Sequence, residues 1–481
     1  MIGMLFFRFG GQAITFLIIA LLARHLGPEQ FGIYSTLTIF VSFCAILLTP
    51  SLNDLLIREA MRKSSNVVTS NDNQSKALNT GYGLRIALAI IGFLIAILVG
   101  PLMGWEGMNT GLFALAAVSL FTSLAMPSVR TAYDVPLQLD YRMDNAAAIN
   151  FAGRTILLFA FLASFSLNAN LTGIVTAQVV GESIAFGLLL VMLAHSKYSI
   201  KPVFDFGSLK TIALVAAPLV LAETFTVIYT RLDVLLLNHF IGAREAGIFA
   251  GPLRIIDGLQ IIPTVILGSL IPLLNRLKQE NNASFQRAIK LSARAFWVCG
   301  IICAVCLSPF SDDITRLFLG NEFSDSSPIL RIGVFCAPLI FVGTLLPAIL
   351  IINGEPKLIA SIYFLLAIIS VGLNLILIPK YGATGAIYSK LITYASIYPL
   401  MLLWQKSRSL FWPFFSQGAI PFALSIFFAY LLQRLNLPVT WGLPAILLLS
   451  LSLVWFSGWL GRSILLEMKH LFTIGTSTEL D

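Results

Sequence analysis

The chain has 481 residues, of which 57% are apolar and only 11% are charged. A soluble domain carries about 25% charged residues, so this composition excludes an ordinary soluble protein and indicates that lipid is the surrounding solvent. The formal net charge is +8 at pH 7, and the positions of the basic residues must therefore decide whether nucleic acid is a partner.

Apolar runs of about 20 residues follow one another along the chain, and each can cross a hydrocarbon core about 30 Å thick. In chain order we predict spans at residues 4–25, 31–52, 81–103, 111–133, 146–167, 172–194, 210–237, 247–274, 292–311, 328–352, 358–379, 385–404, 416–434 and 441–462. The expected fold class is an all-α polytopic membrane protein with about fourteen transmembrane helices. The short alternating segments of an outer-membrane barrel do not occur.

The basic residues follow membrane topology. The first apolar run lacks a small-residue cleavage site and is expected to be a spanning helix instead of a removed signal. With the N-terminus inside, about 21 Lys and Arg residues fall in cytoplasmic loops and ends, about 6 outside and about 4 within helices. One outside loop instead carries acids, namely Asp312, Asp313, Glu322 and Asp325. This bias predicts cytoplasmic N- and C-termini, and it argues against nucleic acid as a partner.

Two sequence echoes indicate an internal repeat. HLGPEQFGIY (25–34) matches HFIGAREAGIF (239–249), with Gly27 opposite Gly242 at an offset of 215 residues, and Leu171–Ile174 matches Ala383–Ala386 at an offset of 212. We therefore predict an N-lobe of six helices at 1–200, a C-lobe of six helices at 201–410, and two further helices with a cytoplasmic tail at 411–481. Parallel repeats of this kind are a transporter architecture. The alternative is that glycine-rich turns resemble one another anywhere, and the glycines themselves are expected to need only turn chemistry.

Charged residues inside the apolar runs point to a polar site. Each costs about 2.5–3.5 kcal/mol at the bilayer centre, so all of them facing lipid would cost on the order of 20–28 kcal/mol. They must therefore face a water-filled cavity, pair with one another, or both. Arg254 and Asp257 share one helix face and can touch, whereas Arg231 and Asp233 point in different directions. Buried salt bridges that only fix helix order are the alternative. The eight residues are Arg154, Glu182, Glu223, Arg231, Asp233, Arg254, Asp257 and Lys390.

Four stretches resemble one family in the same order. LLARHLGPEQFGIYS (21–35) resembles the opening signature of the Wzx-type polysaccharide flippases, which belong to the multidrug/oligosaccharidyl-lipid/polysaccharide exporter superfamily. The stretches 231–255, 320–332 and 354–394 are similar to the same pattern. The resemblance is weakest in spans three to six and after residue 405. It implies a V-shaped two-lobe fold in the bacterial inner membrane and an oligosaccharide on undecaprenyl diphosphate as the substrate, flipped from the inner to the outer leaflet.

The resemblance also implies that charged lumen residues handle the sugar-diphosphate head. Within the matching stretches this role falls on Arg231, Asp233, Arg254 and Lys390, and burial extends it to the other four residues. We expect Arg154, Arg231, Arg254 and Lys390 to contact the diphosphate, because guanidinium groups suit bidentate phosphate contacts. Glu182, Glu223, Asp233 and Asp257 are expected to take up protons or sodium.

Several alternatives remain open at this stage. A drug/cation antiporter of the same superfamily would have twelve helices and an acid-dominated chamber, and a lipid II flippase would differ in its sugar. A membrane-embedded polymerase or ligase would need a large catalytic outside loop. No Walker A loop, H-E-x-x-H or G-x-S-x-G motif occurs, so we expect no enzyme activity, cofactor or metal. The expected partners are the lipid-linked substrate and membrane lipids, and a polysaccharide polymerase and chain-length regulator.

Overall fold

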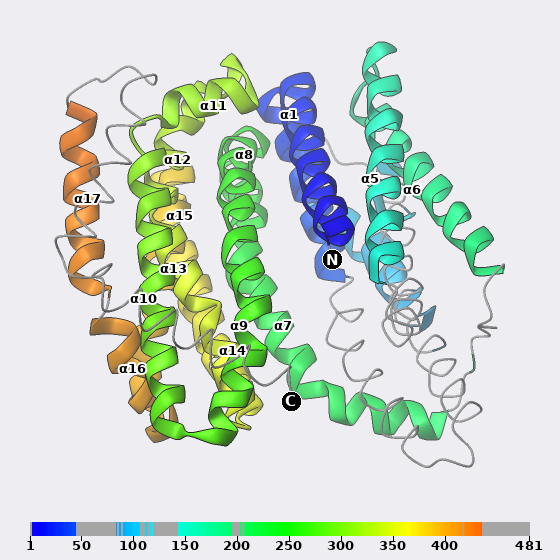
Figure 1. Cartoon of the computed structure of the whole chain (residues 1–481). Coiled ribbons are helices and arrows are strands. Elements are labelled where there is room, and N and C mark those ends of the chain that lie inside the picture. The colour runs from blue at the N-terminus through cyan, green and yellow to red at the C-terminus, as the bar shows by residue number, and fades with distance from the viewer. Residues whose placement is uncertain are drawn as a thin grey trace. The chain divides into compact units, whose positions relative to one another are not determined.

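The computed structural model describes residues 2–44, 83, 86–87, 90–105, 111–112, 116–118, 143–194, 203, 206–416 and 418–434. Every regular element among these residues is a helix (Figure 1). Seven of the described helices are long and apolar enough to cross a membrane, or up to eight if a bent helix pair forms one span. The chain is therefore an all-α, multi-pass membrane protein. The predicted span at 441–462, and most of the one at 111–133, lie outside the described residues.

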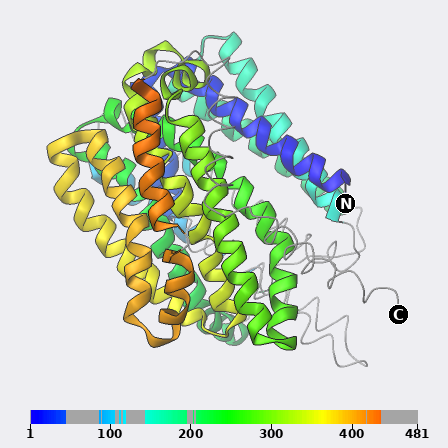
Figure 2. The same cartoon turned by 60° about the vertical axis from the view of Figure 1, so that its left-hand side comes forward.

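The chain forms two compact units, Met1–Gly247 and Ile248–Asp481. In the first unit, α5 packs against both α1 and α6, and α7 packs against α1. Figure 2 shows α5 and α6 running beside the blue α1. The predicted lobe boundaries after residues 200 and 410 stay predictions. The elements of this unit are α1 (Ile2–Cys44), η2 (Gly100–Met103), α5 (Met143–Ser166), α6 (Leu171–Ala194) and α7 (Phe206–Phe240), and the first turn of α8 (Ala243–Leu259) also belongs to it.

Two very long helices are interrupted where the sequence predicts separate spans. Within α1 the backbone leaves helical geometry at Gly27, whose φ is 66°, and Pro28 starts the next helical segment. Proline suits the first helical position because its fixed φ is already helical and no N–H is lost from the helix. In α15 (Pro356–Leu400) the break falls at Gly382, whose φ is 56°. A straight helix of 45 residues would be about 68 Å long, which is about twice the hydrocarbon thickness, so α15 is long enough for two spans. Both breaks fall between two predicted spans.

The second unit is organised around α10. This helix contacts α9, α13, α16 and α17, and Figure 1 shows it beside α13. Gly300 permits the close approach of α10 to α13, because a Cβ there would lie only 2.8 Å from the backbone nitrogen of Pro338. The elements that follow α8 are α9 (Ile261–Glu280), α10 (Asn282–Leu307), α11 (Ser311–Leu319), η3 (Asn321–Ser326), α12 (Ser327–Gly333), α13 (Cys336–Gly343), α14 (Leu345–Ile352), α15, η4 (Met401–Leu403), α16 (Gln405–Ser416) and α17 (Ala419–Arg434).

The predicted span at 328–352 is not one straight helix. Its residues fall into α12, α13 and α14, and the segments Asn321–Gly333 and Cys336–Ile352 are bent by 52° relative to each other. Hydropathy joins these residues into one predicted span, because it measures length and composition but not the backbone path, although Arg331 and Pro338 lie on either side of the bend.

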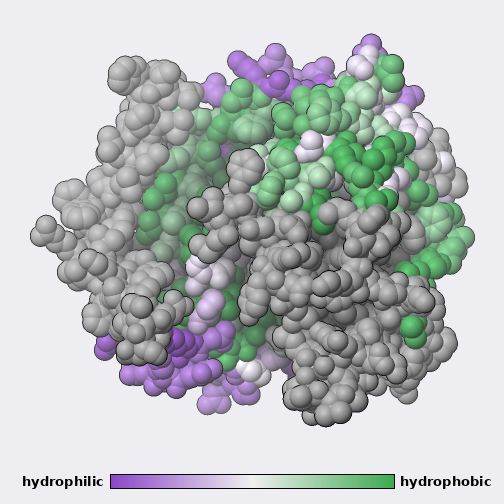
Figure 3. Space-filling model, turned by 45° about the vertical axis from the view of Figure 1, so that its right-hand side comes forward, coloured by the Kyte–Doolittle hydropathy of each residue, from purple (hydrophilic) through white to green (hydrophobic). Residues whose placement is uncertain are grey.

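Large apolar side chains on the outer faces of the helices identify the lipid-facing surfaces. Along α6, Val180, Ile184, Leu188 and Val191 are each at least half exposed, and their spacing places them on one helix face. Contiguous exposed apolar stripes are rare on soluble monomers. In the view of Figure 3 the described surface is largely apolar, with hydrophilic residues gathered near the upper and lower edges. This pattern is the one that a lipid environment requires.

Candidate substrate-handling site

The first sequence echo forms a reciprocal backbone contact within the first unit. A Cβ added at Gly32 would lie 2.8 Å from the nitrogen of Gly247 and would overlap the carbonyl oxygen of Ala243. Conversely, a Cβ at Gly247 would lie 3.0 Å from the nitrogen of Gly32 and would overlap the carbonyl oxygen of Pro28. Pro28 and Ala243 are themselves equivalent at the 215-residue offset. The two echoes therefore pack against each other in matching fashion, and we call this contact the glycine crossing.

The glycines of the echo have two different physical roles. Gly27 and Gly242 have φ angles of 66° and 129°, which is the left-handed geometry that glycine adopts at little cost. For this pair the expectation of turn chemistry is correct. For Gly32 and Gly247 it is wrong, because they are helical and are needed for close backbone approach.

A buried hydrogen bond lies beside the glycine crossing. The Asn238 side-chain amide on α7 donates to the Thr36 hydroxyl on α1 at 2.8 Å, and both residues are buried. Buried polar groups of this kind stabilise a structure only while they remain paired. The bond therefore ties α1 to α7 in this arrangement and would have to be exchanged for water if the two helices separated.

A hydrogen-bonded chain in the first unit ends on one of the predicted site residues. The Tyr34 hydroxyl donates to the Gln178 side-chain carbonyl at 2.9 Å, and the Gln178 amide donates to the Glu182 carboxylate at 3.1 Å. Tyr34 follows the glycine crossing on α1, and the other two residues are one turn apart on α6. We call this chain the acid cluster. It holds a half-buried carboxylate that can accept a proton or a cation.

The second unit buries a lysine among aromatic rings. Lys390 on α15 is 4% exposed, and its Nζ lies 6.0 Å from the ring centroid of Phe249 and 5.8 Å from that of Tyr394. Aromatic faces attract a cation at about this distance. We call this group the lysine cluster. The Lys390 ammonium offers three N–H donors, from which an anionic group reaching this position could accept hydrogen bonds.

The two clusters occupy equivalent positions of the repeat. Tyr34 corresponds to Phe249 at the offset of 215 residues, whereas Gln178 corresponds to Lys390 and Glu182 to Tyr394 at the offset of 212. In the first unit, Tyr34 of the first echo contacts Gln178, which follows the second echo on α6. In the second unit, Phe249 of the first echo lies beside Lys390, which follows the second echo on α15. The scaffold is repeated, but its side chains are acidic in one unit and basic in the other.

The remaining predicted residues divide between the same two units. Arg154 on α5 is exposed, whereas Glu223, Arg231, Arg254 and Asp257 are half-buried on α7 and α8. Every predicted residue except Arg154 has at least one further non-covalent partner.

Asp233 is 2% exposed, and its carboxylate accepts a hydrogen bond from the backbone N–H of Val234 at 2.9 Å. The first unit holds two bases and three acids of the set, a net charge of −1, and the second holds two bases and one acid, a net charge of +1. Convergence of all eight residues on one crevice stays a prediction.

The fold is similar to the folds of solved transporters. A solved structure titled "Lipid II flippase MurJ, inward closed conformation" is similar, with a TM-score of 0.70 and 14% sequence identity, covering 95% of this chain and 99% of that chain. At this identity the likeness concerns the fold alone. A second solved structure with a similar fold, titled "Inward-facing conformation of a multidrug resistance MATE family transporter of the MOP superfamily", has a TM-score of 0.68 and 14% sequence identity, covering 83% of this chain and 94% of that chain.

The family follows from the sequence match. Residues 4–278 match the model of the family described as "Polysaccharide biosynthesis protein", which is more than half of the chain. The protein belongs to the polysaccharide biosynthesis protein family. This result confirms the resemblance drawn from the four sequence stretches.

Two bacterial relatives share one printed name, "Putative O-antigen transporter". The protein from Shigella dysenteriae is 27% identical over 258 residues, which cover 53% of this chain and 64% of that protein. The protein from Shigella flexneri is 23% identical over 422 residues, which cover 83% of this chain and 96% of that protein. The second match runs through both units.

Proposed function

We propose that the protein moves oligosaccharides linked to undecaprenyl diphosphate from the cytoplasmic to the periplasmic leaflet of the bacterial inner membrane. Membership of the family, the transporter fold and the names of the Shigella relatives support this assignment. The protein acts as a transporter and catalyses no chemical step. Its product is then available to a polysaccharide polymerase and a chain-length regulator on the outer side.

The observation that carries the proposal is the opposite charge of two equivalent clusters, of which the acid cluster is half-buried and the lysine cluster is buried. The polyprenyl tail is soluble anywhere in the hydrocarbon, so the polar head is the obstacle to flipping. The lysine cluster, together with Arg254, Arg231 and Arg154, contacts the diphosphate, and Lys390 exchanges its aromatic surroundings for phosphate oxygens. Charged hydrogen bonds to phosphate are among the strong ones in proteins.

The acid cluster couples this binding to an ion. Glu182 takes up a proton or sodium, and the hydrogen bond from Gln178 holds its carboxylate in place for that exchange. Glu223, Asp233 and Asp257 are further carriers. A ligand or ion shifts a conformational equilibrium only by the difference in its affinity for the two states, so loading of the acid must differ between the inward and outward states.

The glycine crossing closes one side of the transport path. The two glycines of this contact belong to different predicted six-helix lobes. The proposal keeps the predicted total of about fourteen spans, and it keeps both termini in the cytoplasm. When the lobes part on that side, Gly32 and Gly247 separate and the Asn238–Thr36 bond breaks. Alternating access then exposes the head-group site first to the cytoplasm and then to the periplasm, while the tail stays among membrane lipids.

Deletion of the gene tests the function. We expect lipid-linked oligosaccharide to accumulate on the cytoplasmic leaflet, and its sugar composition to match the surface polysaccharide that the cells lose. Plasmid-borne wild type should reverse both effects. If the deletion strain keeps its surface polysaccharide and accumulates no lipid-linked saccharide, then the proposed substrate is wrong. Accumulation of the peptidoglycan precursor would instead support the lipid II alternative.

A further inference from the structure

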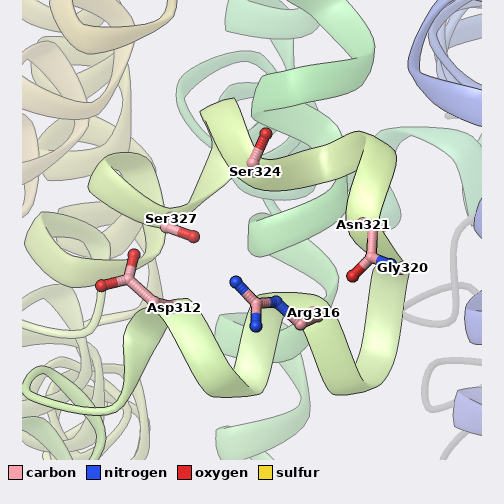
Figure 4. A pocket seen from close by; sticks show the side chains of 6 residues that line it. All are labelled: Asp312, Arg316, Gly320, Asn321, Ser324 and Ser327. Atoms are coloured by element: carbon pink, nitrogen blue, oxygen red, sulfur yellow. The ribbon is translucent and has the colours of Figure 1, made fainter.

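We propose a second saccharide site in the second unit, for the uncharged sugars of the exported glycan. The proposal rests on the function proposed above and adds a binding site on the predicted outer side. The site is a pocket of about 400 Å³ formed by α11, η3 and the start of α12 (Figure 4). Its lining is mainly polar: Asp312, Arg316, Gly320, Asn321, Ser324 and Ser327.

The pocket contains hydrogen-bonding groups that the protein itself does not use. In the part of the chain that the structure describes, no hydrogen bond or ion pair involves the side chain of Arg316, Asn321 or Ser324. Figure 4 shows the Arg316 guanidinium between Asp312, Ser327 and Asn321. A guanidinium offers five N–H donors, a carboxylamide both donors and an acceptor, and a hydroxyl one donor and two acceptor lone pairs. These groups together match a ligand that is rich in hydroxyl groups.

The walls of the pocket are fixed by contacts that do not involve a ligand. Arg331 donates to the Asp312 carboxylate at 2.7 Å and to the Ser311 hydroxyl at 3.1 Å. The Ser326 hydroxyl donates to the backbone carbonyl of Ile248 at 2.8 Å and so anchors η3 to α8. Phe323 of η3 is fully buried. A binding site that is held in shape before the ligand arrives loses less free energy to ordering when the ligand binds.

Local charge favours a neutral ligand over a diphosphate. Residues 312–331 contain four acids, Asp312, Asp313, Glu322 and Asp325, and two bases, Arg316 and Arg331, which gives a net charge of −2. An excess of acid raises the cost of bringing a polyanion to this pocket. Hydroxyl groups carry no such penalty, because each can donate to Asp312 or accept from Arg316.

The position of α11 places this pocket where an emerging glycan would pass. Leu317 and Phe318 on this helix are 70% and 36% exposed, whereas Ser311, Thr315 and Leu319 are buried. A helix with one exposed apolar edge and several charged residues suits the membrane interface. This apolar edge, together with the predicted outer position of residues 312–325, supports placing the pocket at the level where sugars leave the membrane while the lipid tail is still within it.

Binding of simple glycosides to the full chain in lipid nanodiscs tests the site. Saturation-transfer-difference NMR would use the methyl glycosides of glucose, galactose, mannose, rhamnose and N-acetylglucosamine as probes. We expect at least one to bind, and Arg316→Ala to weaken that binding about tenfold, because two or more hydrogen bonds are lost. Asp313→Asn is the matched control, since Asp313 is exposed on the same helix but does not line the pocket. This control should bind like the wild type.

Three results would overturn the inference: no glycoside binds, Arg316→Ala binds like the wild type, or inorganic phosphate displaces the glycoside. Asn321→Ala provides a second, smaller change at an exposed residue, and the same unfolding temperature as the wild type would show that the variants are folded. Failure of this inference is distinct from failure of the proposed function. If the deletion strain accumulates lipid-linked saccharide but glycoside binding is independent of Arg316, only the outer site is wrong. If binding depends on Arg316 and nothing accumulates, only the function is wrong.

Discussion

The acid cluster and the lysine cluster sit on the same repeated scaffold and differ in every side chain. In the first unit, Tyr34, Gln178 and Glu182 form a chain of two hydrogen bonds. At the equivalent positions of the second unit, aromatic rings surround the ammonium of Lys390. Glycines of the repeat hold the backbone, and the neighbouring side chains set the charge. A pair of similar units can thereby divide the work of transport, with ion binding in one and phosphate binding in the other.

The energetic balance of the two clusters differs as well. A hydrogen bond between neutral groups contributes about 0.5–1.5 kcal/mol to stability, and the loss of one partner leaves the other buried and unsatisfied. A buried ammonium instead carries a desolvation cost that its partners must offset. Stability and export should therefore be measured together for substitutions in either cluster.

The largest effect is expected where the two repeats touch. Gly32→Ala or Gly247→Ala should reduce export to near background, because the added methyl would overlap a backbone carbonyl that cannot rotate away. Overpacking of this kind costs about 1–3 kcal/mol or more, so the unfolding temperature should fall too. Gly11→Ala is the control, since position 11 on the same helix has open space around it. Equal export by Gly32→Ala and Gly11→Ala would show that transport does not need the close contact.

Removal of the buried cation should give the next largest effect. We expect Lys390→Met to lower export by about thirtyfold or more, since loss of a charged contact in a buried site costs at least about 2 kcal/mol. The unfolding temperature of the variant, measured beside export, shows whether it is folded. Lys380→Met, at an exposed position of the same helix, should export normally. A variant that exports well without Lys390 would remove the lysine cluster from the head-group site.

Glu182→Gln should lower export about tenfold, a loss of about 1.4 kcal/mol, and should abolish its dependence on the ion gradient. The amide keeps the size of the side chain but cannot release a proton or balance a sodium ion. Export rates with and without an uncoupler measure this dependence. Glu29→Gln, which changes an exposed acid on α1, should keep the dependence of export on the ion gradient. If Glu182→Gln stays sensitive to the uncoupler, coupling belongs to another acid.

The smallest effect is expected from a substitution that makes the acid cluster resemble the lysine cluster. Tyr34→Phe places in the first unit the residue that the second unit has at the equivalent position, Phe249. It removes one hydrogen bond from Gln178 and should lower stability by about 1 kcal/mol, with export reduced only a few-fold. Tyr388→Phe, at an exposed site, should change neither. A severe loss of export in Tyr34→Phe would mean that this hydroxyl contacts the substrate directly.

The sequence predicted the fold class, the family and the breaks near residues 27 and 382. Long apolar runs, the Gly27–Pro28 pair and Gly382 carry that information locally. It also singled out Glu182 and Lys390 as candidates, because a charge inside an apolar run is conspicuous, and their roles stay predictions. The bend between α12 and α13 was not predicted, because the mean hydropathy of residues 328–352 fits one span, and Arg331 and Pro338 on either side of the bend do not lower it enough to divide the run.

Hydropathy also gives no sign of four polar residues that the sequence alone did not single out: Tyr34, Gln178, Thr36 and Asn238. Uncharged polar side chains are common in transmembrane helices, and only the fold shows that these four are paired across helices. The 212-residue offset places Gln178 opposite Lys390, and that correspondence is the one signal that could have identified it. The pocket around Arg316 depends on the turn at Gly320, whose φ is 97°.

Flipping by the purified protein tests the central proposal most directly. The full chain would be reconstituted in liposomes with the lipid-linked saccharide from the deletion strain, and sugars on the outer leaflet would be oxidised with membrane-impermeant periodate. We predict that wild-type protein makes the inner-leaflet pool accessible to periodate and that Lys390→Met does not. Protection of that pool in the presence of correctly folded wild-type protein and an imposed ion gradient would contradict the account.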